Sequence, residues 1–216
     1  KVTAFKYAWQ ANITEGEGRP MADTNVVKRT YPWQTSVGGV EMTLRLMEPS
    51  DRDTILSFGR SLPDHDLLFL RSDVTDPKVI DEWVENLKKG RTITVMAEGG
   101  GELLGYASLH HNEVLWTRHV GEIRVMLKPE LRGFGLGKAL ANEVFAIAKD
   151  LGLQKVMVQM TTDQRGARGM VESLGFRPEA LLADFVMGRD GRTYDLLIMS
   201  YDVTGFSDSA ETRPRR

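Results

Sequence analysis

One stretch of the chain limits its possible folds more than any other, because a half-polar segment runs into a glycine-rich turn and then into an amphipathic segment. Residues 122–129 read E-I-R-V-M-L-K-P, and residues 130–140 read E-L-R-G-F-G-L-G-K-A-L. A strand, a tight turn and a helix in this order leave backbone N–H groups without partners at the helix start, where the helix dipole is positive. Glycines at 133, 135 and 137 remove the Cβ atoms that would keep an anion away from this backbone. The segment therefore predicts a site for a phosphorylated cofactor.

The turn fits neither of two common phosphate-binding motifs. A P-loop needs Gly-x4-Gly-Lys-Ser/Thr, but here the first position holds Arg132 and the last holds Ala139. The dinucleotide fingerprint Gly-x-Gly-x-x-Gly would place Lys138 or Leu140 where its third glycine belongs. A plain tight turn between a strand and a helix could contain the same glycines, so the choice depends on the surrounding sequence.

The spacing Arg-x-x-Gly-x-Gly, formed by Arg132, Gly135 and Gly137, resembles the pyrophosphate-binding signature of the GNAT superfamily of N-acetyltransferases. Residues 164–176, Q-R-G-A-R-G-M-V-E-S-L-G-F, look like the family segment Asn-x-x-Ala-x-x-x-Tyr-x-x-x-Gly-Phe. The resemblance covers about residues 40–203 and implies that acetyl-CoA is the co-substrate. The cofactor-binding residues that it implies are Val125, Met126, Leu127, Arg132, Gly133, Phe134, Gly135, Leu136, Gly137, Lys138 and Gln164.

Hydrophobic periodicity supports the order of elements that this resemblance implies. Strands are predicted at residues 40–47, 92–97, 103–110, 114–127, 156–160, 181–187 and 194–201. Helices are predicted to open at Ser50 and at Asp76, and to occupy residues 136–151 and 167–174. We expect an α/β (α+β) fold of the GNAT type, with a bent, mostly antiparallel central sheet, helices on both faces, and splayed fourth and fifth strands.

Length and composition favour one domain of ordinary size. The chain has 216 residues, of which 41% are hydrophobic, enough for a substantial core. We expect an N-terminal extension over residues 1–38, a GNAT acetyltransferase domain over residues 39–204 and a disordered tail over residues 205–216. Trp9 and Trp33 in the extension are expected to pack on the main body, or on a second subunit in a homodimer.

Several classes of function are disfavoured by composition. The net charge of −2 provides no basic field for nucleic acid or an anionic membrane. The absence of cysteine excludes a disulfide framework, a thiolate metal site and a cysteine nucleophile. His110 and His111 are adjacent, so on a strand they face opposite sides and make a poor metal chelate; no metal is expected. No segment approaches 18 apolar residues and no leader is visible, so a cytoplasmic location is expected.

Glu122 is the predicted catalytic residue. An acceptor ammonium must lose a proton before it attacks a thioester, and a carboxylate can take that proton. Strand alternation places Glu122, Arg124 and Met126 on one face of an otherwise apolar segment. The position of Glu122 before the turn also resembles that of the acidic base in amine-acetylating members such as the phosphinothricin acetyltransferases. The alternative is an ion pair between Glu122 and Arg124 on a solvated sheet face.

The segment 164–176 departs from the family pattern in two places. Gln164 replaces the asparagine, and Val171 stands where a tyrosine commonly acts as general acid. Because valine cannot donate a proton, either the thiolate leaves into water or another group serves. Tyr106 and Tyr194 are alternative donors, although each could equally be a packing residue.

The acceptor is the least determined part of the function. The loop at residues 63–76 contains Asp64, His65 and Asp66, which could recognise a cationic acceptor or could simply be solvated. Three functions therefore stay open. The first is acetyl transfer from acetyl-CoA to a small-molecule amine, by direct attack through a ternary complex. The second is transfer to a protein lysine, and the third is a non-catalytic acyl-CoA-binding sensor.

Overall fold

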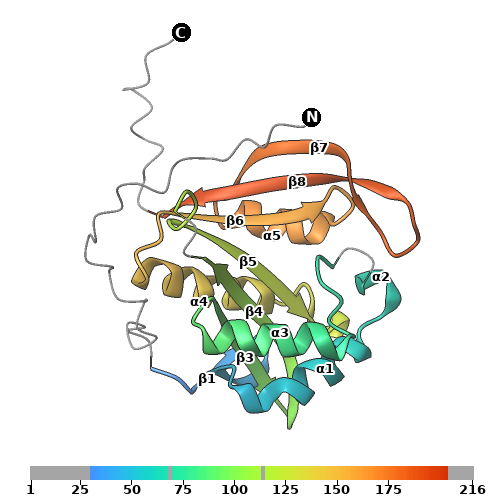
Figure 1. The fold of residues 1–216 in the computed structure, drawn as a ribbon. Coiled ribbons are helices and arrows are strands. Elements are labelled where there is room, and N and C mark those ends of the chain that lie inside the picture. Colours follow the sequence, from blue (N-terminus) through green and yellow to red (C-terminus); the bar gives the residue numbers. More distant parts are fainter. Residues whose placement is uncertain (1–29, 68–69, 113–114, 204–216) are drawn as a thin grey trace, which may run out of the picture.

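The computed structural model describes residues 30–67, 70–112 and 115–203 (Figure 1). Most of the predicted extension, including Trp9, and the predicted tail lie outside the described residues. The domain boundaries at residues 38 and 204 therefore stay predictions.

The core of the fold is a sheet of eight strands in the order β1-β2-β3-β4-β5-β6-β8-β7. All neighbouring strands are antiparallel except β5 and β6, which are parallel. The strands are β1 (Trp33–Val37), β2 (Val40–Leu46), β3 (Thr92–Gly99), β4 (Glu102–His111), β5 (Val120–Leu127), β6 (Lys155–Thr161), β7 (Arg177–Met187) and β8 (Thr193–Asp202). The helices are η2 (Pro49–Asp51), α1 (Arg52–Ser61), α2 (Asp64–Leu67), α3 (Pro77–Lys88), η3 (Pro129–Leu131), α4 (Leu136–Asp150) and α5 (Arg165–Ser173). The predicted mixed fold with a mostly antiparallel sheet is confirmed.

The sheet opens between β5 and β6, as predicted for the strand that carries Glu122. The two strands pair only over their first three residues, and the last pair is Glu122 with Met157. Beyond this point β5 stays paired with β4 as far as Leu127, whereas β6 stays paired with β8 as far as Thr161. Each strand therefore follows a different half of the twisted sheet, and the two diverge towards their carboxyl ends (Figure 1).

Helices cover both faces of the sheet, and each face has its own apolar core. On one face, α1 and α3 bury Ile55 and Ile80 against Met96 of β3. On the other face, α4 buries Leu140 and Val144, and α5 lies beside it. All five side chains are fully buried. The two cores hold the opened part of the sheet between them, which fixes the position of β5.

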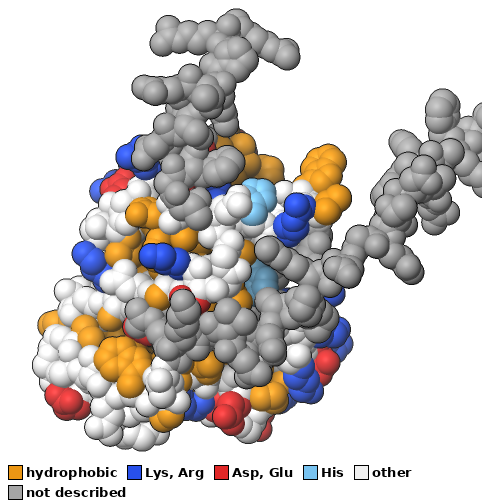
Figure 2. Space-filling model, turned by 90° about the vertical axis from the view of Figure 1, so that its left-hand side faces the viewer, with side chains coloured by type: hydrophobic (Ala, Val, Ile, Leu, Met, Phe, Trp, Pro, Cys, Tyr) orange, Lys and Arg blue, Asp and Glu red, His pale blue; other side chains and the backbone are white. Residues whose placement is uncertain are grey.

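The surface carries both signs of charge. On the face drawn in Figure 2, acidic and basic side chains are interspersed, and neither gathers into a broad patch. This agrees with the nearly balanced composition of 28 basic and 30 acidic residues. Among the described residues, no helix is long and apolar enough to cross a membrane.

The first helical region begins differently from the prediction, which placed the N-cap at Ser50. The N-cap is Glu48, which precedes Pro49 at the first helical position. The backbone N–H of Glu48 donates to Oδ2 of Asp51 at 2.7 Å, and the side chain of Glu48 accepts from the Asp51 backbone, so the two residues form a reciprocal capping box. Proline fits this start because its missing N–H would have had no helical partner. The predicted cap of α3 at Asp76 is confirmed, since its carboxylate accepts from the Lys78 N–H.

Two strand predictions also need correction. The strand predicted at residues 114–127 starts only at Val120, because a turn precedes it in which the Val120 N–H donates to the Thr117 carbonyl. Leu115 and Trp116 in this turn are exposed, so their apolar character does not indicate a strand. In the opposite direction, residues 33–37 lack clear alternation but form β1, which pairs with β2 along its whole length. A strand at the sheet edge can form from backbone pairing alone, without a hydrophobic period.

Candidate active site

The glycine-rich turn ends in a left-handed residue that starts helix α4. Gly133 and Gly135 have φ values of 84° and 94°, in the region that favours glycine, and Gly135 is the N-cap of α4. No side chain caps this helix. Leu136, Gly137 and Lys138 are the first three residues of this 15-residue helix, so their N–H groups have no acceptor within it. This is the anion-binding geometry that the sequence predicted.

Two contacts tie the turn to neighbouring segments. Phe134 is exposed but its backbone lies against Gly38, where an added Cβ would come within 2.7 Å of the Phe134 Cβ. Arg132, predicted to lie near the pyrophosphate, donates two hydrogen bonds of 2.8 Å to the carboxylate of Asp66 in α2. Asp66 is therefore engaged with the glycine-rich turn, and the prediction that it recognises a cationic acceptor is not supported by this geometry. Lys138 is exposed in the first turn of α4.

A cavity of about 490 Å³ fills the opening between β5 and β6. Four predicted site residues line it: Glu122, Val125, Met126 and Gln164. The turn residues and Leu127 do not line the cavity. They lie next to it, because Ala141, one helical turn after Gly137, forms part of its wall. The structure thus places the predicted residues in two adjoining groups, one at the turn and one in the cleft.

The end of β6 offers polar groups to this cleft. The side-chain carbonyl of Gln164 accepts a hydrogen bond of 3.0 Å from the Thr161 backbone N–H, which leaves the Gln164 amide as a donor. The Thr161 hydroxyl is buried and finds no hydrogen-bond partner within the described part of the chain. Both residues line the cavity. A buried hydroxyl without a partner is costly, so a ligand with amide groups, such as the pantetheine arm of coenzyme A, suits this wall.

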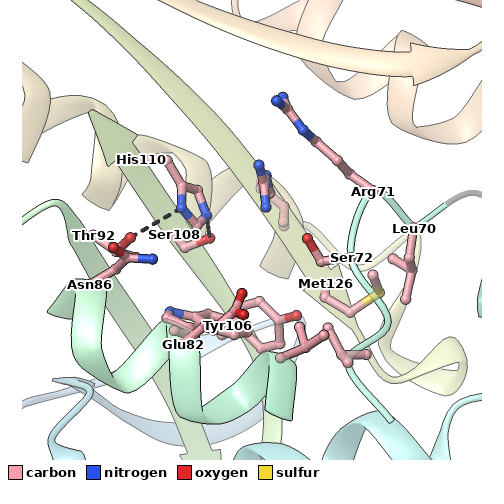
Figure 3. A pocket seen from close by; sticks show the side chains of 15 residues that line it. Leu70, Arg71, Ser72, Glu82, Asn86, Thr92, Tyr106, Ser108, His110 and Met126 are labelled. Carbon is pink, nitrogen blue, oxygen red and sulfur yellow. Dashed lines mark hydrogen bonds between the residues drawn. The ribbon is translucent and has the colours of Figure 1, made fainter. Parts of the chain in front are cut away.

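A second, smaller cavity of about 260 Å³ lies on the other side of β5, between β4, β5 and α3 (Figure 3). Cross-strand pairing places Tyr106 opposite Met126, Ser108 opposite Arg124, and His110 opposite Glu122, so these side chains share one face of the sheet. The cavities share five lining residues, namely Leu70, Arg71, Arg124, Val125 and Met126. They therefore meet beside the middle of β5.

Glu122 forms ion pairs with two arginines near this junction. Arg71 donates from Nη1 to Oε2 of Glu122 at 2.6 Å, and Arg124 donates from Nε to Oε1 at 2.8 Å. The Glu122 side chain is 16% exposed, whereas that of Arg71, which comes from the loop before α3, is 58% exposed. The ion pair with Arg124 was the predicted alternative to catalysis. Its presence leaves the catalytic role of Glu122 a prediction, since the same carboxylate also lines the cleft.

On the same face, the partly buried His110 and the buried Tyr106 each hold one protonation state near pH 7. The imidazole of His110 lies 3.1 Å from the Thr92 hydroxyl and 2.8 Å from the Ser108 hydroxyl. Burial, followed by the charges of Arg124, Arg71 and His111, lowers the pKa of His110 to about 3, so the ring is neutral near pH 7. Burial raises the pKa of Tyr106 well above its usual range, although the nearby Arg124 charge opposes the shift. The phenol therefore keeps its proton.

The three positions considered for the general acid lie in different parts of the structure. Val171 is buried and lines the cleft, so the family's tyrosine position is occupied by an apolar side chain. Tyr106 lines the smaller cavity. Tyr194 lines neither of the two cavities, and its hydroxyl donates to Asp190 at 2.7 Å.

Sequence reasoning missed Arg71, the second partner of Glu122. It lies 51 residues before Glu122 in a loop without periodicity, and nothing in its neighbourhood indicates the contact. His110 and Ser108 were part of a predicted strand, and their alternation with Tyr106 was the available signal for a polar row. Within the described residues no group of histidines and carboxylates is arranged to hold a metal ion.

A mixed sheet that opens between two parallel strands, beside a glycine turn that starts a helix, defines the fold of the GNAT acetyltransferases. The chain belongs to the acetyltransferase (GNAT) family, whose sequence profile matches residues 60–176, more than half of the chain. The predicted resemblance and fold class are thereby confirmed.

Among curated proteins, YwnH of Bacillus subtilis, provisionally assigned as a phosphinothricin acetyltransferase, is 23% identical over 167 residues, which cover 76% of this chain and all of YwnH. The amino-acid acetyltransferase of Mycobacterium tuberculosis is 33% identical over 118 residues, or 53% of this chain and 59% of that protein. Among solved structures, yncA of Salmonella typhimurium, a provisionally assigned acetyltransferase solved with acetyl-CoA, has a TM-score of 0.66 and 22% identity, and the match covers 75% of this chain and 94% of that one. At this identity the structural likeness shows the fold alone.

Proposed function

We propose that the protein is an acetyl-CoA-dependent N-acetyltransferase that transfers the acetyl group to a primary amine by direct attack within a ternary complex. The observation that carries this proposal is the meeting of two cavities beside Val125 and Met126. A thioester lying in the cleft and an amine lying in the smaller cavity would face each other there, next to Glu122. The names of two curated relatives, a provisionally assigned phosphinothricin acetyltransferase and an amino-acid acetyltransferase, support an amine acceptor.

The cofactor would be held first by backbone groups. The free N–H groups of Leu136, Gly137 and Lys138 are placed for the pyrophosphate, and the Lys138 side chain adds positive charge. Arg132 donates two hydrogen bonds to Asp66, so it would stabilise the turn and need not contact the phosphates. Acetyl-CoA would supply the activated acetyl group, and these residues of the protein would hold it in place.

The transfer itself needs one proton removed and one delivered. Glu122 takes a proton from the acceptor ammonium, directly or through a water, and the amine nitrogen then forms a bond to the thioester carbonyl carbon. Backbone N–H groups of β5 that face the opening, where the ladder to β6 ends, would stabilise the negative charge that develops on the carbonyl oxygen. The carbon–sulfur bond breaks, and the thiolate leaves and takes up a proton.

The proton for the thiolate has two possible sources. The Tyr106 hydroxyl keeps its proton and lies in the smaller cavity, on the same sheet face as Met126. Water is the other source, since a thiol of ordinary acidity, with a pKa of about 8.5, can leave as the anion near neutral pH. The Tyr106→Phe variant distinguishes the two sources. Its kcat should fall if Tyr106 delivers the proton, and should stay unchanged if water does.

The proposed function is tested by free-thiol release from acetyl-CoA with a panel of small amines and lysine peptides. Turnover with small amines but not peptides is expected, because the acceptor cavity of about 260 Å³ is below the roughly 300–1,000 Å³ of typical ligand pockets. Turnover with peptides alone would instead identify a protein lysine acetyltransferase.

A non-catalytic acyl-CoA sensor is the second candidate, and two observations favour it. Valine occupies the family's usual acid position, and both oxygens of Glu122 accept hydrogen bonds from arginines. A sensor would bind acetyl-CoA with micromolar affinity in calorimetry and release no thiol with any acceptor in the panel. Thiol release well above the uncatalysed rate removes this candidate.

A further inference from the structure

Two guanidinium groups share a single carboxylate where the two cavities meet. Among the residues that line the larger cavity, the charged ones are Arg71, Glu122 and Arg124. In the smaller cavity, the charged lining residues are Arg71, Arg124 and Glu82, an exposed residue of α3. The group formed by Arg71, Glu122 and Arg124 therefore carries one excess positive charge.

The two arginines also have hydrogen-bonding capacity to spare. A guanidinium has five N–H donors. Arg71 and Arg124 each donate one side-chain hydrogen bond, to Glu122, and make no other within the described part of the chain. His110 adds no charge to this region, because its ring is neutral. Several donors and an excess of positive charge next to a cavity are the features that recognise an anion.

The charge also affects which amines can approach. Beside Glu122, a simple alkylammonium would add its positive charge to the excess charge of the two arginines, which costs electrostatic free energy in a partly buried site. An amine that carries a carboxylate beside it has no net charge and brings a partner for the arginines. Such a molecule meets this site without that repulsion.

We propose that the acceptor is a small amine with an adjacent anionic group, such as a carboxylate, and that Arg71 and Arg124 bind this group in exchange for Glu122. The proposal rests on the proposed function. When the acceptor anion takes over the hydrogen bond from Arg71, Oε2 of Glu122 loses its donor and its lone pair becomes available for the ammonium proton. Recognition of the anion and release of the base are then the same event. Arg71 suits this exchange because it is the more exposed of the two arginines and comes from a loop (Figure 3).

The cavity also limits the rest of the acceptor. Its lining includes the apolar side chains of Leu70, Val74, Val79 and Trp83, together with the hydroxyls of Ser72 and Ser108. A compact acceptor with an uncharged side chain fits this mixture and volume. L-leucine is a suitable probe, and 3-methylbutylamine differs from it only by the missing carboxylate.

The test compares kcat/KM for these two probes in the wild-type protein and in Arg71→Gln, with Arg60→Gln as the matched control. Arg60 is an exposed arginine of α1 that lines neither cavity. L-leucine should be preferred over 3-methylbutylamine by at least about 10-fold in kcat/KM, and Arg71→Gln should lower this ratio by about 10-fold or more, the value of one charge-assisted hydrogen bond. Arg60→Gln should leave the preference unchanged. Equal turnover of both probes, or a preference that survives in Arg71→Gln, overturns the proposal.

The Glu122→Gln variant should show changes in KM and Kd that a purely structural role for Arg71, Glu122 and Arg124 would not produce. Without the competing carboxylate, both arginines are available to the acceptor anion, so the KM for L-leucine should fall while kcat falls as well. The Kd of 4-methylpentanoate, which has the anion but no amine, should decrease in the same variant when measured by calorimetry with CoA present. An unchanged or weaker Kd overturns the exchange between Glu122 and the anion.

The outcomes separate this proposal from the proposed function. If no acceptor in the panel releases thiol, the transferase function fails, while calorimetry with 4-methylpentanoate still tests the anion site. If amines are turned over without regard to a carboxylate, only the anion site fails. A preference for succinyl-CoA over acetyl-CoA with 3-methylbutylamine would assign the arginines to the acyl group and overturn the acceptor assignment.

Discussion

Replacing Glu122 with glutamine is the most direct test of the chemistry. Glutamine keeps the size and one acceptor oxygen, but it cannot take a proton from the acceptor ammonium. If Glu122 is the base, kcat should fall by about 10²–10⁴-fold, which corresponds to roughly 3–5 kcal/mol of lost transition-state stabilisation. Acetyl-CoA affinity should change little, since its phosphates are proposed to bind at the turn beyond Leu127.

The structure predicts that this loss is not caused by unfolding. The partners of Glu122 are partly solvated, with Arg71 58% and Arg124 33% exposed. Ion pairs of this kind contribute about 0.2–1 kcal/mol to stability because water screens them. Removing one charge therefore destabilises the fold by much less than the expected catalytic loss, and the variant should stay folded.

The assay is steady-state thiol release over a range of pH, with circular dichroism melting to monitor folding. The loss should shrink as the pH approaches the amine pKa of about 10, because more acceptor then arrives already deprotonated. Glu85→Gln is the matched control, since Glu85 also pairs with a cation, Lys88 at 2.8 Å, but lies on the exposed side of α3. An unchanged kcat in Glu122→Gln would show that Glu122 is only an ion-pair partner, and a loss that is independent of pH would argue against a base.

Three further predictions concern stability and the turn. Leu140→Ala should lower the unfolding free energy by about 2–5 kcal/mol in urea denaturation, because its side chain is fully buried between α4 and the sheet. Acidification from pH 7 to 4.5 should destabilise the wild type more than His110→Asn. The unfolded imidazole, with a pKa of about 6.5, takes up a proton in this range, whereas the folded one, with a pKa of about 3, does not. Equal pH slopes would contradict this assignment. Gly135→Ala should weaken acetyl-CoA binding by at least about 10-fold in calorimetry, because a φ of 94° is strained for alanine. Gly152→Ala, at a φ of 73°, is the control distant from the turn. Unchanged affinity in Gly135→Ala would show that the turn does not hold the pyrophosphate.

Local patterns in the sequence predicted most of the helices and strands and the geometry of the glycine-rich turn. A strand followed by closely spaced glycines and an amphipathic helix predicted free N–H groups at residues 136–138, and the left-handed Gly135 provides them. Alternation also placed Glu122, Arg124 and Met126 on one face. These features depend on backbone geometry and on periods of two or about 3.6 residues, which are properties of short segments.

Other features depended on the chemistry of single residues and were predicted less well. Ser50 is a good cap in isolation, yet Glu48 and Asp51 form the cap because Pro49 fixes the first helical position and Arg45 holds Asp51 through two hydrogen bonds of 2.7 Å. The apolar residues before Val120 suggested a longer strand, but a turn ends the pairing. Such competition between local alternatives is decided by neighbours that the segment itself does not contain.

The tertiary structure alone decided how the site is assembled. Arg71 reaches Glu122 across 51 residues, and Arg132 reaches Asp66 across 66 residues. Both contacts arise because α1, α2 and the following loop pack against β4 and β5, and no period in the sequence encodes that approach. The sequence predicted which groups would hold a cofactor and which carboxylate would act as a base. Only the packing of distant segments decided that a second arginine, Arg71, binds this carboxylate and that two cavities meet beside it.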